Sequence, residues 1–217
     1  MKNIPRIFIG DNIKGGIQIP LPRETMHYLT RVMRTRECLV FGGGDEYTAT
    51  LSDDDKSLII GNKTPHADPS NDITLMFSPI KHTDDLINMA TQIGVARFLP
   101  VITSRTVAHH INWERMRKIA TESAEQSNRN SVPEILEPVK FSDLDLSDIV
   151  FADERAAYGV NTSNNFDVKK ILIGPEGGFS DDEFSALDAS GARGVGLGKT
   201  ILRAETAAIV ALAKIIK

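Results

Sequence analysis

The spacing of apolar residues divides the chain into two parts with different patterns. In the first seventy residues, short β-prone runs at 38–41, 47–51 and 58–60 are separated by turn-forming Gly and Asp clusters, which predicts a small β-rich unit. One helix, 24–34, is predicted within this unit because apolar residues recur there at helical spacing. The polar segment 63–71 contains two prolines and no apolar run, so we place a domain boundary there.

Beyond this boundary, strands alternate with helices. The predicted strands are 73–77, 98–102, 149–151, 170–173 and 194–197. The predicted helices are 83–93 with Gly94 as its stop, one that begins after Asn112 as N-cap, one that opens with a Ser180–Glu183 capping box, and a last one through Lys214. This alternation predicts an α/β fold with a mostly parallel sheet covered on both faces.

Composition indicates a globular chain, with 41% apolar and 25% charged residues. The single cysteine, Cys38, excludes an internal disulfide and favours a cytoplasmic location. The first ten residues lack the apolar core of a signal peptide, and no apolar stretch approaches the ~20 residues that span a bilayer. The lack of such a stretch predicts no membrane partner. The adjacent His109 and His110 have no carboxylate cluster beside them, so we expect no metal partner either.

The net charge of −4, from 25 Lys+Arg and 29 Asp+Glu, by itself argues against nucleic-acid binding. Residues 1–70 are neutral, however, and the acidic excess lies entirely in residues 71–217. The arginines gather in short stretches of both parts, so the average charge does not exclude RNA.

Glycines concentrate near the end of the chain, where seven of the 16 fall between positions 174 and 198. Two glycine-bearing loops, 174–179 and 195–200, follow apolar strands, and ligands of α/β sheets bind beyond the carboxyl ends of strands. Glycine lets the backbone approach a ligand closely. No G-x-x-x-x-G-K-[ST] motif is present, and Lys199 replaces the third glycine of G-x-G-x-x-G. A P-loop or a nicotinamide site is therefore disfavoured.

A polar trio, Arg203, Glu205 and Thr206, stands at the start of the last predicted helix. Glu205 is favourable near the positive end of a helix dipole, whereas Arg203 is a cation at the disfavoured end. The helix start alone therefore does not account for Arg203, and we consider both residues candidates for chemistry.

Two long stretches, 173–180 (IGPEGGFS) and 197–207 (LGKTILRAETA), resemble the two cofactor loops of the SPOUT methyltransferases. Within that group, the chain resembles the RsmE family of 16S ribosomal RNA uridine-N3 methyltransferases. Four further stretches carry this resemblance, in order along the chain: Pro5–Phe8, His27–Arg34, Thr103–Val107 and Glu125–Glu134.

The resemblance implies a PUA-like RNA-binding β-barrel over residues 1–70. It implies a SPOUT α/β domain over residues 71–217, with a C-terminal trefoil knot. It further implies S-adenosyl-L-methionine as cofactor, a homodimer, and a uridine of 16S rRNA in the small ribosomal subunit as substrate.

The resemblance also implies roles for individual residues. The cofactor would contact Ile173, Gly174, Glu176, Gly177, Gly178, Leu197, Gly198, Ile201 and Leu202. Glu205 would be the base, or orient the base, that removes the uridine N3 proton, and Arg203 would hold a phosphate or the developing negative charge. The RNA phosphates would contact Arg31, Arg34, Arg105 and Arg129.

One position departs from the family pattern, because Thr200 stands where arginine is common in the second loop. Two alternatives remain open at this point. One is another SPOUT activity, such as ribose 2′-O methylation of transfer RNA, and the other is a non-catalytic ribosome-assembly factor. The Glu125–Pro133 stretch argues against the first, and the intact Gly177-Gly178 and Arg203–Glu205 argue against the second.

Overall fold

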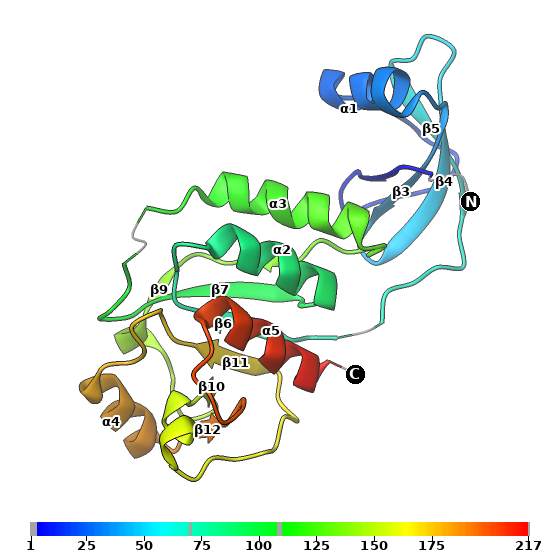
Figure 1. Cartoon of the computed structure of the whole chain (residues 1–217). Helices are drawn as coiled ribbons and strands as arrows, with labels where there is room; N and C mark the ends of the chain where they lie inside the picture. Colours follow the sequence, from blue (N-terminus) through cyan, green and yellow to red (C-terminus); the bar gives the residue numbers. More distant parts are fainter. Residues whose placement is uncertain (1–3, 70, 108–109, 217) are drawn as a thin grey trace. The chain divides into compact units, whose positions relative to one another are not determined.

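A computed structural model describes residues 4–69, 71–107 and 110–216, which form two compact units (Figure 1). The first unit contains the residues up to 70 together with Thr121–Val132, and the second contains residues 71–120 and 133–217. The sequence alone predicts that residues 121–132 belong to the second domain. The structure assigns them to the first unit because their side chains and backbone bond to it, as described below.

The first unit is built on a five-stranded sheet in the order β1-β3-β4-β5-β2. Its strands are β1 (Arg6–Phe8), β2 (Gln18–Pro20), β3 (Glu37–Gly42), β4 (Asp45–Leu51) and β5 (Ser57–Lys63). β1 pairs with β3 in parallel, and the other neighbours are antiparallel. The three longer strands confirm the sequence prediction, whereas β1 and β2 are only three residues long and give no periodic signal.

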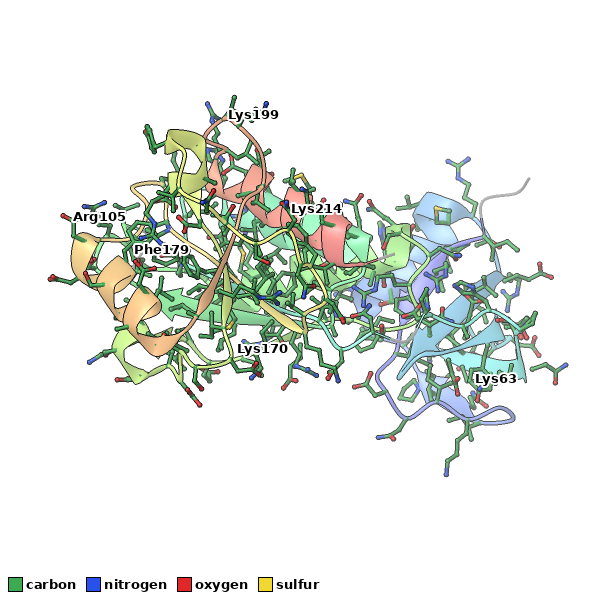
Figure 2. The ribbon with its side chains drawn as sticks, turned by 90° about the horizontal axis from the view of Figure 1, so that it is seen from below. Lys63, Arg105, Lys170, Phe179, Lys199 and Lys214 are labelled. Atoms are coloured by element: carbon green, nitrogen blue, oxygen red, sulfur yellow. The ribbon has the colours of Figure 1, made fainter. Side chains whose placement is uncertain are left out.

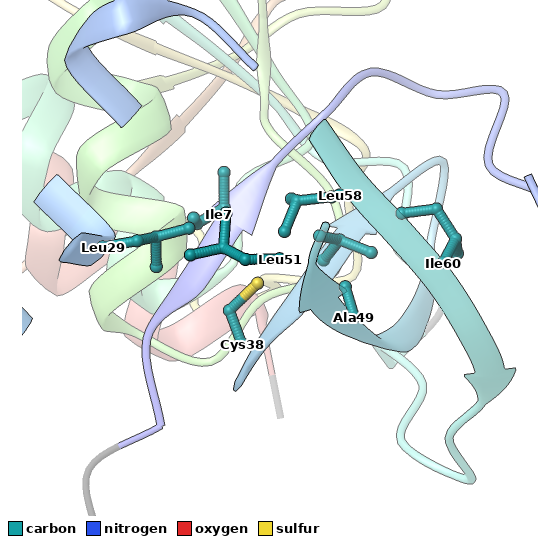
Figure 3. Packing of buried hydrophobic residues seen from close by; sticks show 8 residues of the cluster. Ile7, Leu29, Cys38, Ala49, Leu51, Leu58 and Ile60 are labelled. Atoms are coloured by element: carbon teal, nitrogen blue, oxygen red, sulfur yellow. The ribbon is translucent and has the colours of Figure 1, made fainter. Parts of the chain in front are cut away.

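The core of the first unit follows the alternation of its strands. Residues two apart on β3, β4 and β5 point inward and pack together with Ile7 and Leu29 (Figure 3). The buried cluster comprises Ile7, Leu29, Cys38, Val40, Ala49, Leu51, Leu58 and Ile60. Burial raises the pKa of the Cys38 thiol to about 12, so this cysteine is a core residue without nucleophilic character at neutral pH.

The predicted helix 24–34 is wrong as a single α-helix. A short α1 (Arg23–His27) continues as a π-helical segment, η1 (Tyr28–Met33), which ends where Arg34 adopts a left-handed conformation with φ of 50°. Leu29 is buried as predicted, but Val32 is 60% exposed. The wider π turn moves the later apolar positions away from the core, and the α-helical i, i+3 rule no longer applies.

Thr121–Val132 belongs to the first unit through a hydrogen-bond network centred on Arg6. The Arg6 guanidinium pairs with Glu46 through Nε at 2.9 Å and donates through Nη2 to Asn130 Oδ1 at 2.6 Å. Glu125 Oε1 accepts from the Phe8 amide at 3.1 Å, and the Asn130 amide donates to the Asp68 carboxylate at 2.7 Å. Two stretches that carry the family resemblance, Pro5–Phe8 and Glu125–Glu134, are thus joined here.

The second unit has a parallel sheet in the order β12-β10-β11-β6-β7-β8, with β9 pairing beside β7. Its strands are β6 (Thr74–Phe77), β7 (Arg97–Ile102), β8 (Glu134–Ile135), β9 (Val139–Lys140), β10 (Val150–Ala152), β11 (Lys170–Ile173) and β12 (Arg193–Val195). All of its ladders are parallel, which confirms the predicted class of sheet.

The four helices predicted beyond the domain boundary are confirmed, and the one at 113–126 ends in the first unit. They are α2 (Thr83–Ile93), α3 (Trp113–Gln126), α4 (Asp181–Ser190) and α5 (Ala204–Ile215), with two short 3-10 turns, η2 (Phe141–Asp143) and η3 (Glu154–Tyr158). Gly94 ends α2 with φ of 114°, and Ser180 and Glu183 form both bonds of the capping box that opens α4. α2 and α5 lie on one side of the sheet and α4 lies on the other (Figure 1).

Candidate active site

A cavity of about 670 Å³ opens at the carboxyl ends of β10 and β11, where α5 begins. This is the edge at which ligands of parallel α/β sheets bind, and the volume is in the range of small-molecule sites. It is lined by Lys81, His82, residues 152–154, Ala157, Tyr158, residues 173–178, Leu197, Gly198, residues 200–205 and Ala207. The whole lining belongs to the second unit.

The fold brings together the two glycine loops, 174–179 and 195–200, which are separated in sequence by α4 and β12. All nine residues predicted to contact a cofactor line this cavity, and so do Arg203 and Glu205. Thr200, the departure from the family pattern, is also part of the lining. Proximity to the cavity does not assign individual roles, which remain predictions.

The clustered glycines divide into two groups with different structural reasons. Gly178 lines the cavity with φ of 68°, and an added Cβ would lie 2.1 Å from Glu154 Oε1. Gly194 and Gly196 do not line it, and a Cβ there would lie 2.7 Å from Asp153 Oδ2 or 2.6 Å from Thr162 Oγ1. Glycines therefore cluster in this region for two reasons: side chains pack closely against the backbone at and just after β12, and the first loop lines the cavity.

The first loop is held from outside by Arg105, whose Nη1 donates to the carbonyls of Gly177 at 2.9 Å and Phe179 at 3.1 Å. Arg105 and Phe179 lie close together at one end of the unit (Figure 2). Glu176 Oε1 accepts from the Lys81 amide at 2.9 Å. These bonds constrain the shape of the loop from both sides.

The stretch Thr103–Val107, singled out by the resemblance, supports this loop from behind. The Ser104 amide donates to Glu183 Oε1 at 2.8 Å, while Glu183 Oε2 accepts from the Ser180 amide at 2.9 Å. The hydroxyls of Thr103 and Thr106 lie 2.9 Å apart in the same buried region. Glu183 thus joins the stretch that carries Arg105 to the start of α4.

Phe179, the last residue of the first loop, anchors it in the core. Its side chain is 1% exposed and packs edge to face against Phe151 and Phe184, with centroid separations of 6.1 and 5.6 Å. These rings belong to the core between the sheet and α4, which also contains Leu187.

The segment after β10 supplies cavity residues that sequence reasoning missed, Asp153 and Glu154 among them. Arg155 donates through Nε and Nη2 to Asp153, at 2.9 and 2.8 Å, and pairs with Asp188 through Nη1 at 2.8 Å. This pairing holds the pKa of Asp188 below its usual range. Asp153 and Glu154 are separated from the predicted strand 149–151 only by Ala152, and charged residues just beyond a strand were the available signal.

Glu154 differs electrostatically from its neighbour Asp153. Its pKa is raised, chiefly because burial disfavours the charged carboxylate and also because Asp153 repels it. The Phe179 amide and the Arg155 charge act in the opposite direction without cancelling the effect.

The two candidate catalytic residues lie on either side of Ala204, the first residue of α5. Arg203 is the N-cap residue, with extended backbone and an exposed side chain that makes no capping bond. Glu205 lies in the first turn and is partly buried. Ala204, between them, is buried, so α5 is anchored while its two polar neighbours border the cavity.

The four arginines predicted to bind RNA have different environments. Arg31 and Arg34 are exposed on the first unit. Arg105 belongs to the second unit and holds the first loop. Arg129 is 9% exposed, bonds to Ser131 Oγ at 3.1 Å, and has its pKa lowered by burial, so it offers little surface to a phosphate. The structure thus gives Arg105 and Arg129 structural contacts that the sequence did not predict.

Two negative observations concern only the described part of the chain. No group of three or more His, Cys, Asp or Glu side chains is placed to hold a metal ion there, and His109 lies outside the described residues. No helix in the described ranges has the length and apolar character needed to cross a membrane.

A family model described as an RNA methyltransferase domain matches residues 67–216, which contain the parallel sheet and the whole cavity lining. The second unit is therefore an RNA methyltransferase domain.

Relatives over the full chain narrow this class. The chain is 32% identical to ribosomal RNA small subunit methyltransferase E of Rickettsia conorii, covering 97% of this chain and 94% of the relative. It is 30% identical to the protein of the same name from Aquifex aeolicus, covering 94% and 95%. It belongs to the ribosomal RNA small subunit methyltransferase E family.

Solved structures agree with this assignment. The fold matches that of ribosomal RNA small subunit methyltransferase E from Neisseria gonorrhoeae, solved with S-adenosyl methionine bound. The TM-score is 0.82 at 26% identity, covering 97% of this chain and 96% of that one. A putative methyltransferase from Legionella pneumophila shares the fold at a TM-score of 0.79 and 22% identity.

Proposed function

We propose that this chain methylates N3 of a specific uridine in 16S rRNA, with S-adenosyl-L-methionine as methyl donor. Its family makes it a methyltransferase of small-subunit ribosomal RNA. The observation that carries the proposal is the single cavity formed by both glycine loops and the start of α5. That cavity places backbone groups, apolar surface and two polar side chains around one ligand-sized volume.

The cavity fits S-adenosyl-L-methionine in the chemistry of its lining. Ile173, Leu197 and Ile201 provide apolar surface for an adenine ring. Gly198 lines the cavity, and a Cβ added there would meet no protein atom within 4 Å. The space beside its Cα is therefore open to a ligand. Backbone groups of the two loops would hold the polar parts of the cofactor. When bound, the cofactor supplies an electrophilic methyl group on a sulfonium sulfur.

The protein's own part in the reaction is to activate and hold the uridine. Uridine N3 carries a proton at neutral pH and is a poor nucleophile until that proton leaves. Glu205 would accept or direct this proton, a role that contributes typically about 10²–10⁴-fold to the rate. Arg203, exposed at the rim, would stabilise negative charge that develops on the uridine oxygens, or hold an adjacent phosphate.

RNA binding would use exposed cations of each unit. Arg31 and Arg34 are the candidates on the first unit. Arg105 on the second unit would contact a phosphate and also bonds to the first loop. We retain Arg129 as the weakest of the four candidates because its side chain is buried.

We further propose the architecture that the resemblance implies. The first unit would be a PUA-like RNA-binding barrel, and the C-terminal part of the second unit would form a trefoil knot around the cofactor. The protein would act as a cytoplasmic homodimer. Sedimentation equilibrium tests the oligomeric state, and a monomer at all micromolar concentrations would contradict the dimer.

Methylation of small ribosomal subunits isolated from a strain that lacks this gene tests the proposed function. Purified protein and methyl-labelled S-adenosyl-L-methionine should place label in 16S rRNA, and mass spectrometry of the digested RNA should identify 3-methyluridine. Label on a ribose 2′-oxygen, or on transfer RNA alone, would favour the other SPOUT activity. Cofactor binding without methyl transfer to any ribosomal RNA would favour an assembly factor.

A further inference from the structure

Glu154 places a carboxylate in the cavity wall that is bonded by the Phe179 backbone amide, and in the described part of the chain it forms no salt bridge with a lysine or arginine side chain. It is partly buried and lines the cavity. Arg155, the adjacent cation in the chain, bonds to Asp153 and Asp188 instead. Arg155 is held further by stacking over the Phe184 ring, with 4.2 Å between the guanidinium carbon and the ring centroid.

The other carboxylates that line the cavity in the described ranges have surroundings that differ from those of Glu154. Asp153 is 5% exposed and accepts three bonds from Arg155. Glu176 is exposed and accepts the Lys81 amide. Glu205 lies in the first turn of α5, where the helix dipole favours a negative charge.

The position of Glu154 is fixed by the first loop. Gly178 approaches its carboxylate so closely that an added Cβ would lie 2.1 Å from Oε1. Arg105 in turn holds the carbonyls on either side of Gly178. The carboxylate is thus pre-positioned, and a buried carboxylate in a ligand cavity gains from a ligand that brings a positive charge.

We propose that Glu154 recognises the positive charge of the methyl donor, so that the site binds S-adenosylmethionine in preference to the demethylated product. This inference rests on the proposed function, because it takes the cavity as the cofactor site. S-adenosylhomocysteine has the same adenosine and amino-acid groups, but its sulfur is a neutral thioether. Loss of the charge on methyl transfer would weaken product binding and favour exchange for new donor.

Calorimetric titration of the full-length protein with each of the two ligands tests this inference. Glu154→Gln removes the charge but keeps the side-chain shape. It should weaken S-adenosylmethionine binding about tenfold and change S-adenosylhomocysteine binding by less than about twofold. The matched control is Glu137→Gln, because Glu137 is an 87% exposed glutamate outside the cavity lining and its replacement should leave the ratio of affinities unchanged.

The outcomes separate the inference from the proposed function. Equal weakening of both ligands would mean that Glu154 bonds to a group they share or only shapes the loop, and would overturn the inference. Unchanged affinity for both ligands would overturn the inference as well. A wild-type protein that binds neither ligand would overturn the proposed function itself.

If a thermal melt shows that Glu154→Gln is not folded, a second variant tests the inference. Glu154→Asp retains the charge and should keep the preference for S-adenosylmethionine within about threefold of wild type. A tenfold loss of preference in this charged, folded variant would contradict recognition by charge.

Discussion

Glu154 and Gly178 illustrate how single residues constrain each other in this cavity. The glutamate carboxylate occupies the space that any larger residue at position 178 would need, and the positive φ of Gly178 disfavours a side chain independently. The two residues lie on different loops, after β10 and β11, and neither constraint depends on a bound ligand.

Replacement of this glycine should therefore disturb the site more than the fold. Gly178→Ala is expected to weaken S-adenosylmethionine binding at least tenfold and to lower stability by about 1–2 kcal/mol, from left-handed strain and the clash. Calorimetry and denaturant unfolding measure the two effects. Gly191→Ala is a suitable control, because Gly191 has φ of 79° at the end of α4 and open space around it. Equal loss of cofactor affinity in the control would contradict a local effect.

The raised pKa of Glu154 gives a stability prediction with a definite sign. The folded protein binds the Glu154 proton more tightly than the unfolded chain, so ionisation costs stability as pH rises through the raised pKa. Glu154→Gln should therefore raise the melting temperature of the ligand-free protein at neutral pH. This gain should shrink as pH falls below the usual glutamate range. A variant less stable than wild type at every pH would contradict this sign.

Glu205 is the residue for which the proposed chemistry is most directly testable. Glu205→Gln should retain S-adenosylmethionine binding and lose methyl transfer about 10²-fold or more, because an amide cannot accept the uridine proton. Single-turnover methylation of small subunits measures the chemical step. A near-normal rate would remove Glu205 from the role of base, and loss of cofactor binding would indicate a role in the ligand site instead.

At the scale of elements, the loop after β11 takes its shape from segments distant in sequence. Ser104 and Arg105 follow β7 and Glu154 follows β10, yet all three bond to or contact the stretch 176–183. In a parallel sheet these connections meet at the same edge, which explains why their side chains converge.

Loss of the Arg105 bonds should loosen this loop. Arg105→Ala is expected to weaken S-adenosylmethionine binding several-fold, because two loop carbonyls lose a charged donor. Calorimetry without RNA isolates this effect from any phosphate contact. Arg115→Ala is the control, since Arg115 is an exposed arginine paired with Asp84 outside the cavity lining. Unchanged cofactor affinity in Arg105→Ala, with weakened RNA binding, would assign Arg105 to RNA alone.

At the scale of the whole molecule, the net charge of −4 coexists with cations on each unit. The first unit presents Arg31 and Arg34, both exposed, while Arg6 and Arg129 are used inside it. An enzyme with this distribution should bind a folded ribosomal surface at a few phosphates and have limited affinity for arbitrary RNA.

Replacement of one exposed arginine tests this footprint. Arg31→Ala should weaken binding to the small subunit and reduce the slope of log affinity against log salt by about one unit. Arg36→Ala is a control on the same unit, because Arg36 bonds to Asp55 and to the carbonyls of Leu51 and Ser52. An unchanged slope for Arg31→Ala would exclude Arg31 from phosphate contact.

Local patterns in the sequence determined most of the elements of this protein. Alternation and capping residues predicted β3, β4, β5, the main strands of the parallel sheet and helices α2 to α5, because these signals act within a few residues. The glycine loops and the polar start of the last helix also indicated the cavity residues, since ligands bind where strands end. Family resemblance, rather than periodicity, supplied the cofactor and substrate.

Tertiary structure alone decided the features that depend on residues far apart in sequence. The π-helical segment at Tyr28–Met33, the transfer of Thr121–Val132 to the first unit, and the burial of Arg129 arise from packing across many intervening residues. Glu154 lies against Gly178, and Arg155 pairs with two aspartates, only because the fold brings the segments after β10 and β11 together with α4. Burial and the allocation of ionic partners are properties of the folded surroundings, so a linear pattern cannot report them.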